Sequence, residues 1–310
     1  MAQILLDESN LGAVVVCFDT GSGFTNRLRR LLNVSHNIVV VINRFSDVSN
    51  QSSFVRQIKS DFIFEITVLK LIIIELDDNY GIGHALNRGV QYLPNRVEWI
   101  IFFDDDTELM FESSLSIYHE VRKTIEIYGD EKFGILGLGY RDSLEDSDKT
   151  AEDSFKLKYS VITSGSVIKK STLQLIGAFR EDYFIDSVDI EYCIRLKSKG
   201  LYVAQSGKIA MIHPIGEKYT RNVLGRKIVF TKHNSLRCYY ITRNRILLGK
   251  QYFRLYPELI LSSTLQTIKH SIEIVLYEDQ KMLKLKSMCI GCWHGICGIS
   301  GKLVKSIVRE

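Results

Sequence analysis

Short apolar runs alternate with segments of helical periodicity through the first hundred residues of the chain. The runs are rich in β-branched residues and are apolar at consecutive positions, which is typical of strands covered on both faces. Strands separated by single helices at this spacing predict βαβ units and a parallel sheet. The predicted strands are residues 11–18, 37–43, 68–76 and 97–103, with helices over 24–32 and 51–64 and from residue 82.

Polar residues follow three of these strands at the point where each strand ends. They are Asn43, the loop 79–83, and the consecutive aspartates Asp104, Asp105 and Asp106. Ligands of open α/β sheets bind beyond the carboxyl ends of the strands, so we expect these groups to converge on one crevice. The three carboxylates repel one another unless a cation neutralises them, which indicates a hard divalent metal held together with substrate phosphates. The alternative is that residues 104–107 only cap the following helix.

The loop 79–83 has a composition suited to a close approach of a ligand. Its two glycines permit a tight turn, and the helix that begins near Ile82 presents free backbone amides. These amides could approach a nucleotide, although an ordinary loop before a helix would look the same.

Later segments are predicted to complete the α/β domain. They are a helix over 109–128, a strand over 133–140, a mobile charged loop over 141–153, a strand pair or a bent strand over 159–168, a short helix from Ser171 to Gly177, and a closing hairpin of strands 201–204 and 208–214. His213 lies at the end of that hairpin. An imidazole there suits either a structural hydrogen-bond donor or a nitrogen ligand to a metal at Asp106.

A second acidic cluster lies at the start of a predicted helix over residues 187–199. Asp186 suits the N-cap, and Asp189 falls in the first turn, where the helix dipole favours an ionised carboxylate. Such a carboxylate can act as a general base, or it can simply cap the helix. Glu191 and Arg195 are four residues apart and can pair on the helix surface.

The composition is that of a globular protein, but the charge is unevenly distributed. Hydrophobic residues make up 45% and charged residues 25% of the 310 residues, and there are only three prolines. These values argue against extended disorder. Residues 1–217 hold 23 Lys and Arg against 31 Asp and Glu, whereas residues 218–310 hold 17 against 5. A basic tail favours an anionic surface or lipid, and no nucleic-acid-binding module is recognisable beside it.

The basic tail contains a segment of helical spacing over residues 255–276. It could lie on a membrane surface or pack on the preceding domain. The chain shows neither an export signal nor an apolar run long enough to span a bilayer. We therefore expect a cytoplasmic protein that is peripheral at the inner face of the cell membrane.

Taken together, these segments resemble the bacterial rhamnosyltransferases, which are inverting GT-A members of glycosyltransferase family 2, and they are similar to galactofuranosyltransferases. The resemblance implies a GT-A fold, an α/β structure with a Rossmann-like, mostly parallel central sheet and flanking helices. It implies a catalytic domain over residues 1–250 and a basic amphipathic helical region over 251–310. It is carried by residues 79–89, the aspartate triplet 104–106, Thr163-Ser164-Gly165, residues 184–195, His213 and residues 237–244.

The resemblance also implies a role for individual residues. Asp189 matches the catalytic base. Asp106 and His213 match metal ligands, and Asp104 matches a residue that contacts the ribose or the metal site. The donor-side residues are Asn43, Asn79, Gly81, Asn87, Asp104 and Asp106, and the acceptor-side residues are Ser164, Gly165, Asp186 and Glu191.

The implied reaction is transfer of a sugar, L-rhamnose from dTDP-rhamnose, with Mg²⁺ or Mn²⁺ as cofactor. The implied partners are a nucleotide-sugar donor, a lipid-linked or polysaccharide acceptor of cell-surface polysaccharide synthesis, and an anionic membrane surface. The chain departs from the family at Ile42, where an aspartate that contacts the base is usual. The departure leaves open a galactofuranosyl or other hexosyl transferase, or a non-catalytic module that binds a nucleotide sugar or glycan.

Overall fold

A computed structural model describes residues 6–110, 114–143, 154–214, 216, 218–223 and 226–303. By its contacts the chain forms two compact units. The first comprises Met1–Phe179 and Tyr192–Pro214, and the second comprises Arg180–Glu191 and Ile215–Glu310. The loop predicted over 141–153 lies outside the described residues from residue 144 onward.

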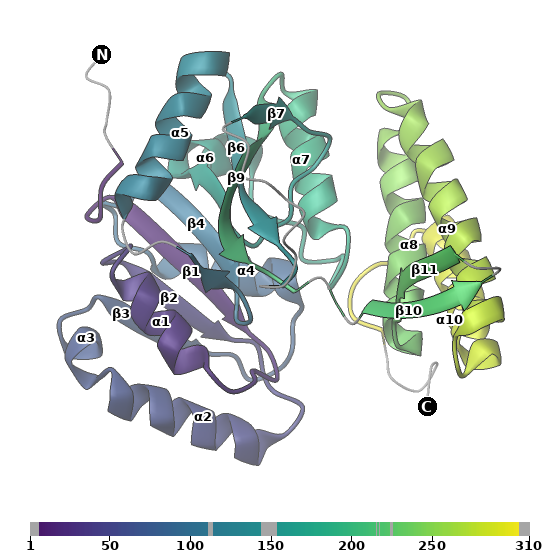
Figure 1. The fold of residues 1–310 in the computed structure, drawn as a ribbon, viewed down its shortest axis with the longest axis horizontal. Helices are drawn as coiled ribbons and strands as arrows, with labels where there is room; N and C mark the ends of the chain where they lie inside the picture. The colour runs from purple at the N-terminus through teal and green to yellow at the C-terminus, as the bar shows by residue number, and fades with distance from the viewer. Residues whose placement is uncertain are drawn as a thin grey trace. The chain divides into compact units, whose positions relative to one another are not determined.

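The first unit is built on a nine-stranded sheet with the strand order β3-β2-β1-β4-β8-β6-β9-β5, and β7 pairs with β9 (Figure 1). Strands β1 to β4 pair in parallel and supply the Rossmann-like half. The predicted α/β fold is confirmed for this unit. Beyond the parallel half the sheet is mixed, because β8 pairs antiparallel with β4 and β6, and β5 and β7 pair antiparallel with β9. The strands are β1 (Leu11–Cys17), β2 (Ile38–Ile42), β3 (Leu71–Glu75), β4 (Trp99–Asp104), β5 (Glu108–Leu109), β6 (Phe133–Arg141), β7 (Phe155–Leu157), β8 (Ser166–Lys169) and β9 (Tyr202–Ile212).

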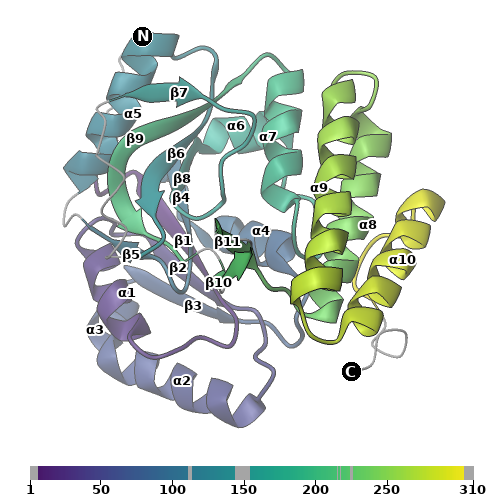
Figure 2. The same cartoon turned by 45° about the vertical axis from the view of Figure 1, so that its right-hand side comes forward.

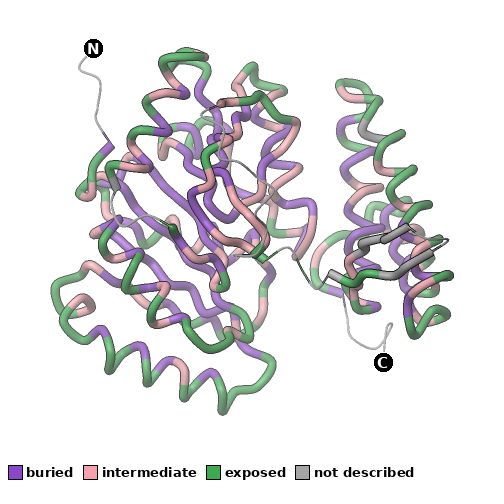
Figure 3. The backbone as a smooth tube through the Cα atoms, in the orientation of Figure 1, coloured by how far each residue is buried: buried purple, intermediate pink, exposed green. Residues whose placement is uncertain are grey.

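Helices cover both faces of this sheet, which explains why its strands are apolar at consecutive positions. The residues of β1, β2 and the first five positions of β4 are all buried, and Figure 3 shows these strands buried along their length. Side chains alternate between faces along a strand, so each face needs its own cover. The helices are α1 (Phe24–Leu32), α2 (Val48–Asp61), α3 (Ile63–Thr67), α4 (Ile82–Tyr92), α5 (Ser114–Tyr128) and α6 (Lys170–Ile176), with α7 (Val188–Ser198) shared between the units.

The register of the parallel strands aligns their carboxyl ends at one edge of the sheet. Cys17 pairs with Ile42, Ile42 pairs with Glu75, and Val16 pairs with Asp104. The residues that follow these strands therefore emerge at the same edge, as predicted from the pattern of polar residues.

The closing hairpin predicted over 201–214 is wrong, because β9 is one continuous strand. It runs parallel to β6 with register shifts between Gly137 and Tyr140. These irregularities let Ser206, Gly207 and Lys208, which look like a turn in the sequence, remain within the strand. The helix predicted from residue 109 begins at Ser114, and the two-residue strand β5 precedes it.

The second unit contains three helices and a hairpin. Helices α8 (Ser235–Tyr252), α9 (Pro257–Tyr277) and α10 (Lys281–Cys297) follow the antiparallel strands β10 (Lys218–Val223) and β11 (Arg226–Thr231). Figure 2 shows the three helices side by side. Gly291 permits close packing of α10 on α8, because a Cβ there would lie 2.5 Å from the backbone oxygen of Tyr239. Among the helices described, none has the length and apolarity needed to cross a membrane.

Candidate active site

Asp104, Asp106 and His213 meet at the carboxyl edge of the sheet. Asp104 is the last residue of β4, and a turn leads from it into β5. Strand β5 pairs with the end of β9, with Glu108 opposite Ile212. This pairing brings the start of β5 beside His213, which directly follows β9, although more than a hundred residues separate the two segments.

The three side chains have the geometry of a divalent-metal site. Their ligand atoms all lie within 4.8 Å of one another. His213 Nε2 is 3.8 Å from an Asp104 carboxylate oxygen, and Nδ1 is 3.4 Å from an Asp106 oxygen. Neighbouring ligands of a six-coordinate Mg²⁺ or Mn²⁺ lie about 3 Å apart, given bonds of about 2.1 Å. Small side-chain rotations close this gap, so the residues fit such an ion, and two carboxylates with one imidazole are a donor set that suits Mn²⁺.

The electrostatics of the cluster also favour a bound cation. His213 is largely buried, with 12% of its side chain exposed, while Asp104 and Asp106 are 38% and 51% exposed. Burial lowers the pKa of His213, but the Asp106 and Asp104 carboxylates outweigh it and hold the pKa above its usual value. The negative potential that stabilises a proton there equally stabilises a divalent cation.

Thr107 links the metal-ligand cluster to a buried hydroxyl network. Its hydroxyl oxygen lies 2.9 Å from His213 Nδ1 and 2.6 Å from the Ser164 hydroxyl oxygen. The Asp104 backbone amide donates to Ser164 at 3.1 Å. Both hydroxyl residues are buried. Partners of this kind fix the orientation of a metal-binding imidazole, and no periodicity in the sequence indicated Thr107.

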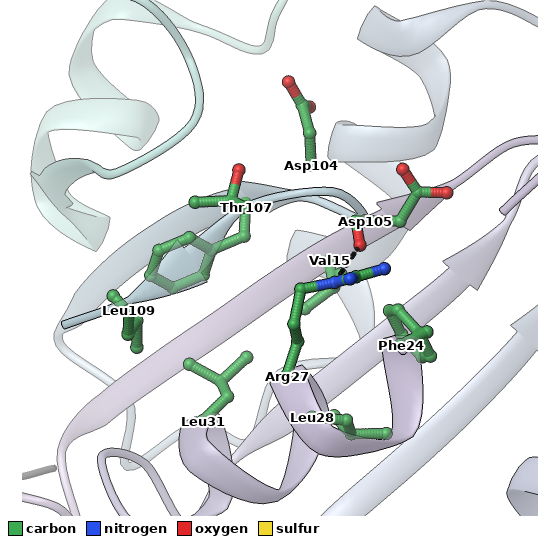
Figure 4. A pocket seen from close by; sticks show the side chains of 10 residues that line it. Val15, Phe24, Arg27, Leu28, Leu31, Asp104, Asp105, Thr107 and Leu109 are labelled. Carbon is green, nitrogen blue, oxygen red and sulfur yellow. Dashed lines mark hydrogen bonds between the residues drawn. The ribbon is translucent and has the colours of Figure 1, made fainter. Parts of the chain in front are cut away.

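Asp105 is held away from the other two aspartates, so we assign it the role of a spacer. Its carboxylate accepts from the Phe18 amide at 3.2 Å and from the Thr20 hydroxyl. Burial raises its pKa despite these hydrogen bonds. Figure 4 shows Asp105 and Arg27 beside a cavity beneath the 104–107 turn, with Arg27 Nε donating to the Asp105 carbonyl at 2.7 Å. The cavity has about 20 Å³, room for one water molecule, so it is not a substrate site.

Asn43 and Asn79 join two of the strand ends predicted to converge. The Asn43 side-chain amide donates to the Asn79 side-chain oxygen at 3.1 Å, and the Asn43 side-chain oxygen accepts from the Tyr80 amide at 3.1 Å. Asn79 in turn accepts from the Gly81 amide at 3.0 Å. These bonds fix the loop that leads into α4, which begins at Ile82 as predicted.

The segment that carries Asp189 has an unusual backbone. Phe184, Asp186 and Ser187 have φ angles of 66°, 62° and 63°, in the left-handed region. Each such residue costs of order 1 kcal/mol, and clusters of them persist where surrounding contacts hold them. This strained turn leads directly into α7, so its conformation sets where the first helical turn begins.

Two adjacent residues of α8 hold that strained turn. Asn244 Nδ2 lies 3.0, 2.7 and 2.9 Å from the carbonyl oxygens of Tyr183, Ile185 and Asp186. Arg243, which is fully buried, donates to the Tyr183 carbonyl at 2.9 Å. The conformation of the Asp189 segment is therefore determined by residues about sixty positions later in the chain.

The Asp189 carboxylate has a pKa shifted toward neutral pH. It lies in the first turn of α7, where the Ile190 amide donates to it at 2.8 Å. Burial raises its pKa to about 6. A carboxylate with this pKa is ionised at neutral pH and is basic enough to accept a proton from a hydroxyl as it reacts.

No protein-family model matches the chain. The chain is 29% identical over 307 residues to the dTDP-rhamnosyl transferase RfbF of Shigella flexneri, covering 95% of this chain and 98% of that protein. It also resembles GalNAc-T7, solved with UDP, GalNAc and Mn²⁺, with a TM-score of 0.57, 10% identity, 94% of this chain covered and 56% of that one. The chain therefore has a GT-A-like fold and is similar to a rhamnosyl transferase along nearly its whole length, and both findings support a metal-dependent glycosyltransferase.

Several residues predicted for the sites also have structural partners. Asn87 exchanges two hydrogen bonds of 2.9 Å with the Phe179 backbone, and its place in the donor site stays a prediction. Glu191 is fully buried and accepts from the Tyr252 hydroxyl at 2.7 Å, and its acceptor-side role stays a prediction.

Three other acceptor-side predictions also find structural partners. Asp186 does not cap α7, because its carboxylate lies 3.2 Å from Arg237. Ser164 belongs to the metal-ligand network described above. Gly165 is left-handed with a φ of 73°, and a Cβ there would lie 2.3 Å from Met211 Cε.

Replacing Thr107 with valine is expected to weaken Mn²⁺ binding by about 10- to 100-fold, because the His213 ring loses the partner that orients it. Isothermal titration with Mn²⁺ measures the effect. Thr107→Ser keeps the hydroxyl and should restore affinity. Thr124→Val removes another buried hydroxyl of the same unit, one that bonds only within α5, and should leave affinity unchanged. Affinity within twofold of the wild type in Thr107→Val would refute the orienting role.

Proposed function

We propose that this protein is an inverting glycosyltransferase that moves L-rhamnose from dTDP-L-rhamnose onto a lipid-linked precursor of a cell-surface polysaccharide at the inner face of the membrane. The proposal is based on the cluster of Asp104, Asp106 and His213, which lies at the carboxyl edge of a GT-A sheet. The similarity to a dTDP-rhamnosyl transferase along nearly the whole chain supports this choice of donor.

The metal-ligand cluster is the proposed binding site of the donor diphosphate. Asp104, Asp106 and His213 would supply protein ligands to a divalent cation, which in turn would attract the donor diphosphate. A divalent cation bound there would neutralise the charge that develops on the departing diphosphate. Thr107 and Ser164 keep the protein ligands oriented, so binding needs little rearrangement of side chains.

The nucleoside end of the donor is assigned to the linked ends of β2 and β3. The hydrogen bonds of Asn43 and Asn79 hold the 79–81 backbone rigidly, and the start of α4 leaves amides that favour anions. Ile42 is buried within β2. It therefore offers no substitute for the aspartate usual at that position. Asn43 is itself buried and bonded to the next loop, so we assign base recognition to the 79–81 segment that it holds.

Asp189 is the proposed general base. Its carboxylate would take the proton from the acceptor hydroxyl as that oxygen attacks the anomeric carbon of the sugar. The bond from the anomeric carbon to the donor phosphate breaks on the opposite side, so the configuration inverts. The strained turn held by Arg243 and Asn244 would keep the carboxylate in place without help from the substrate.

The transfer rate is expected to depend on pH through Asp189. The carboxylate acts only when ionised, and its pKa is raised to about 6. At saturating Mn²⁺, kcat should be level near pH 7 to 8 and should fall toward tenfold per pH unit below pH 6. Measuring kcat from pH 5 to 8 tests this fall on the acidic side. A rate that stays constant down to pH 5 would contradict the assignment of the base.

A screen of nucleotide sugars by thermal denaturation in Mn²⁺ tests the choice of donor. A ligand at 100 times its Kd stabilises the native state by about 2.7 kcal/mol, which raises Tm on the order of 5 °C. dTDP-rhamnose should give the largest shift, and EDTA should remove it. A larger shift with a UDP-linked furanose or another hexose would instead favour a galactofuranosyl or hexosyl transferase, the alternative left open by Ile42.

A further inference from the structure

Helix α9 has one covered face and, opposite it, one open apolar face. On one face, His270 and Ile274 are buried, and Thr267 accepts a hydrogen bond from Arg245 of α8. On the other face a row of large apolar side chains is 47% to 64% exposed. This row, here called the outer α9 face, consists of Leu261, Leu265, Ile268, Ile272 and Val275.

The spacing of these residues makes the outer α9 face continuous. Intervals of four, three, four and three residues place successive side chains beside one another on one side of a helix. Apolar residues scattered singly on a surface are common, but a contiguous row marks an interaction surface. Both the covered face and this open face are thus built into the same 21-residue helix.

Exposed apolar residues also lie on the neighbouring helix of the same unit. Met282, Trp293 and Ile296 of α10 are 81%, 64% and 56% exposed. An exposed tryptophan is costly in water and is favoured at the boundary between lipid headgroups and acyl chains. The other tryptophan of the chain, Trp99, is only 5% exposed.

The charge of this region indicates the chemistry of the partner. Residues 218–310 hold 17 Lys and Arg against 5 Asp and Glu, and Lys269, beside the outer α9 face, is 76% exposed at its side chain. Two copies of so basic a unit repel each other, whereas an anionic bilayer attracts it. An apolar row on a unit of net positive charge combines the two attractions that hold a helix in an anionic membrane interface.

We propose that the outer α9 face docks in the headgroup region of an anionic lipid bilayer. The proposal rests on the proposed function in one respect, that a lipid-linked acceptor is what the docked enzyme would reach. It assigns the docking to particular residues that are separate from those of the metal-ligand cluster.

Vesicle flotation tests the docking surface with the full chain. The wild type should float with vesicles of phosphatidylglycerol and phosphatidylethanolamine, and at least tenfold less with phosphatidylcholine. The triple variant Leu265→Ser, Ile268→Ser, Ile272→Ser should bind the anionic vesicles at least tenfold more weakly. The matched control replaces Ile63, Phe64 and Leu175 with serine, three apolar residues of the first unit that are 66% to 73% exposed, and should bind like the wild type.

A tryptophan probe locates the contact independently of affinity. In a Trp293→Phe background, Ile268→Trp should shift its emission to the blue and be quenched by brominated acyl chains in the anionic vesicles. Leu175→Trp in the same background should show neither effect. Absence of wild-type binding, or equal binding by the triple variant, would overturn the proposal.

A second copy as the occupant is a separate outcome of the experiment. A concentration-dependent dimer that the triple variant abolishes, with no flotation, would also overturn the membrane proposal. Hydrolysis of the donor, in which water takes the place of the acceptor and dTDP and free rhamnose form, does not need the bilayer. The triple variant should retain that reaction, so a failure of the docking surface and a failure of the proposed function give different results.

Discussion

Asp189→Asn is expected to lower kcat for sugar transfer by about 10³-fold, within the range that a general base contributes. The amide has the size of the carboxylate and can still accept from the Ile190 amide, but it cannot take the proton of the acceptor hydroxyl. Donor affinity should stay within a few-fold of the wild type, because the proposed base does not bind the donor. Steady-state kinetics with donor titration separates the two effects.

Asp182→Asn is the matched control for this variant. Asp182 lies in the same segment, and its carboxylate pairs with Arg180, away from any proposed chemistry. The control removes one negative charge from the same unit, so it should keep kcat within a few-fold. Equal losses in the two variants would show that the segment responds to charge or folding, and the base would have to be sought elsewhere.

Asp106→Asn is expected to lower the transfer rate by about 10³-fold and to weaken Mn²⁺ binding strongly. A metal ion at a developing diphosphate contributes several kcal/mol of transition-state stabilisation, and the variant loses one of its charged ligands. Donor binding should weaken in parallel, since the diphosphate shares the site. Titrations with Mn²⁺ and donor, and rates at saturating Mn²⁺, measure all three quantities.

Asp105→Asn provides the contrast within the same triplet. Its carboxylate takes hydrogen bonds from Phe18 and Thr20, and its raised pKa shows that burial opposes the charge. Neutralising it should leave Mn²⁺ affinity within a few-fold of the wild type. If the two variants lost Mn²⁺ equally, the assignment of Asp106 as ligand and Asp105 as spacer would be wrong.

The parts of the site predicted from sequence are those that depend on strand order and strand ends. Apolar runs with polar ends revealed β1 to β4, and the parallel register then places Asn43 and Asp104 at one edge. The strands and helices of this region could be predicted because each is long enough to show its pattern of apolar residues, which has a period of 2 in strands and 3.6 in helices. The metal-ligand role of His213 came from the family resemblance, since one residue at a strand end has no pattern.

Short elements and distant contacts could not be predicted in this way. Strand β5 has two residues, too few for any period, and yet its pairing with β9 brings Thr107 to His213. The Gly207 region reads as a turn because nothing local shows that β6 pairs with it. Arg243 looks like one more charge of a basic tail, but it is fully buried against the Tyr183 carbonyl. Tertiary contacts decide each of these cases.

The most direct test of metal-dependent sugar transfer is to measure release of dTDP from dTDP-L-rhamnose. The assay uses purified protein and membranes that carry the lipid-linked acceptor. We expect release with Mn²⁺, transfer of labelled rhamnose to the lipid fraction, and loss of both with EDTA or in Asp106→Asn. A non-catalytic module would bind the donor and release nothing. Full release in the presence of EDTA, or none with any nucleotide sugar, would contradict a metal-dependent transferase.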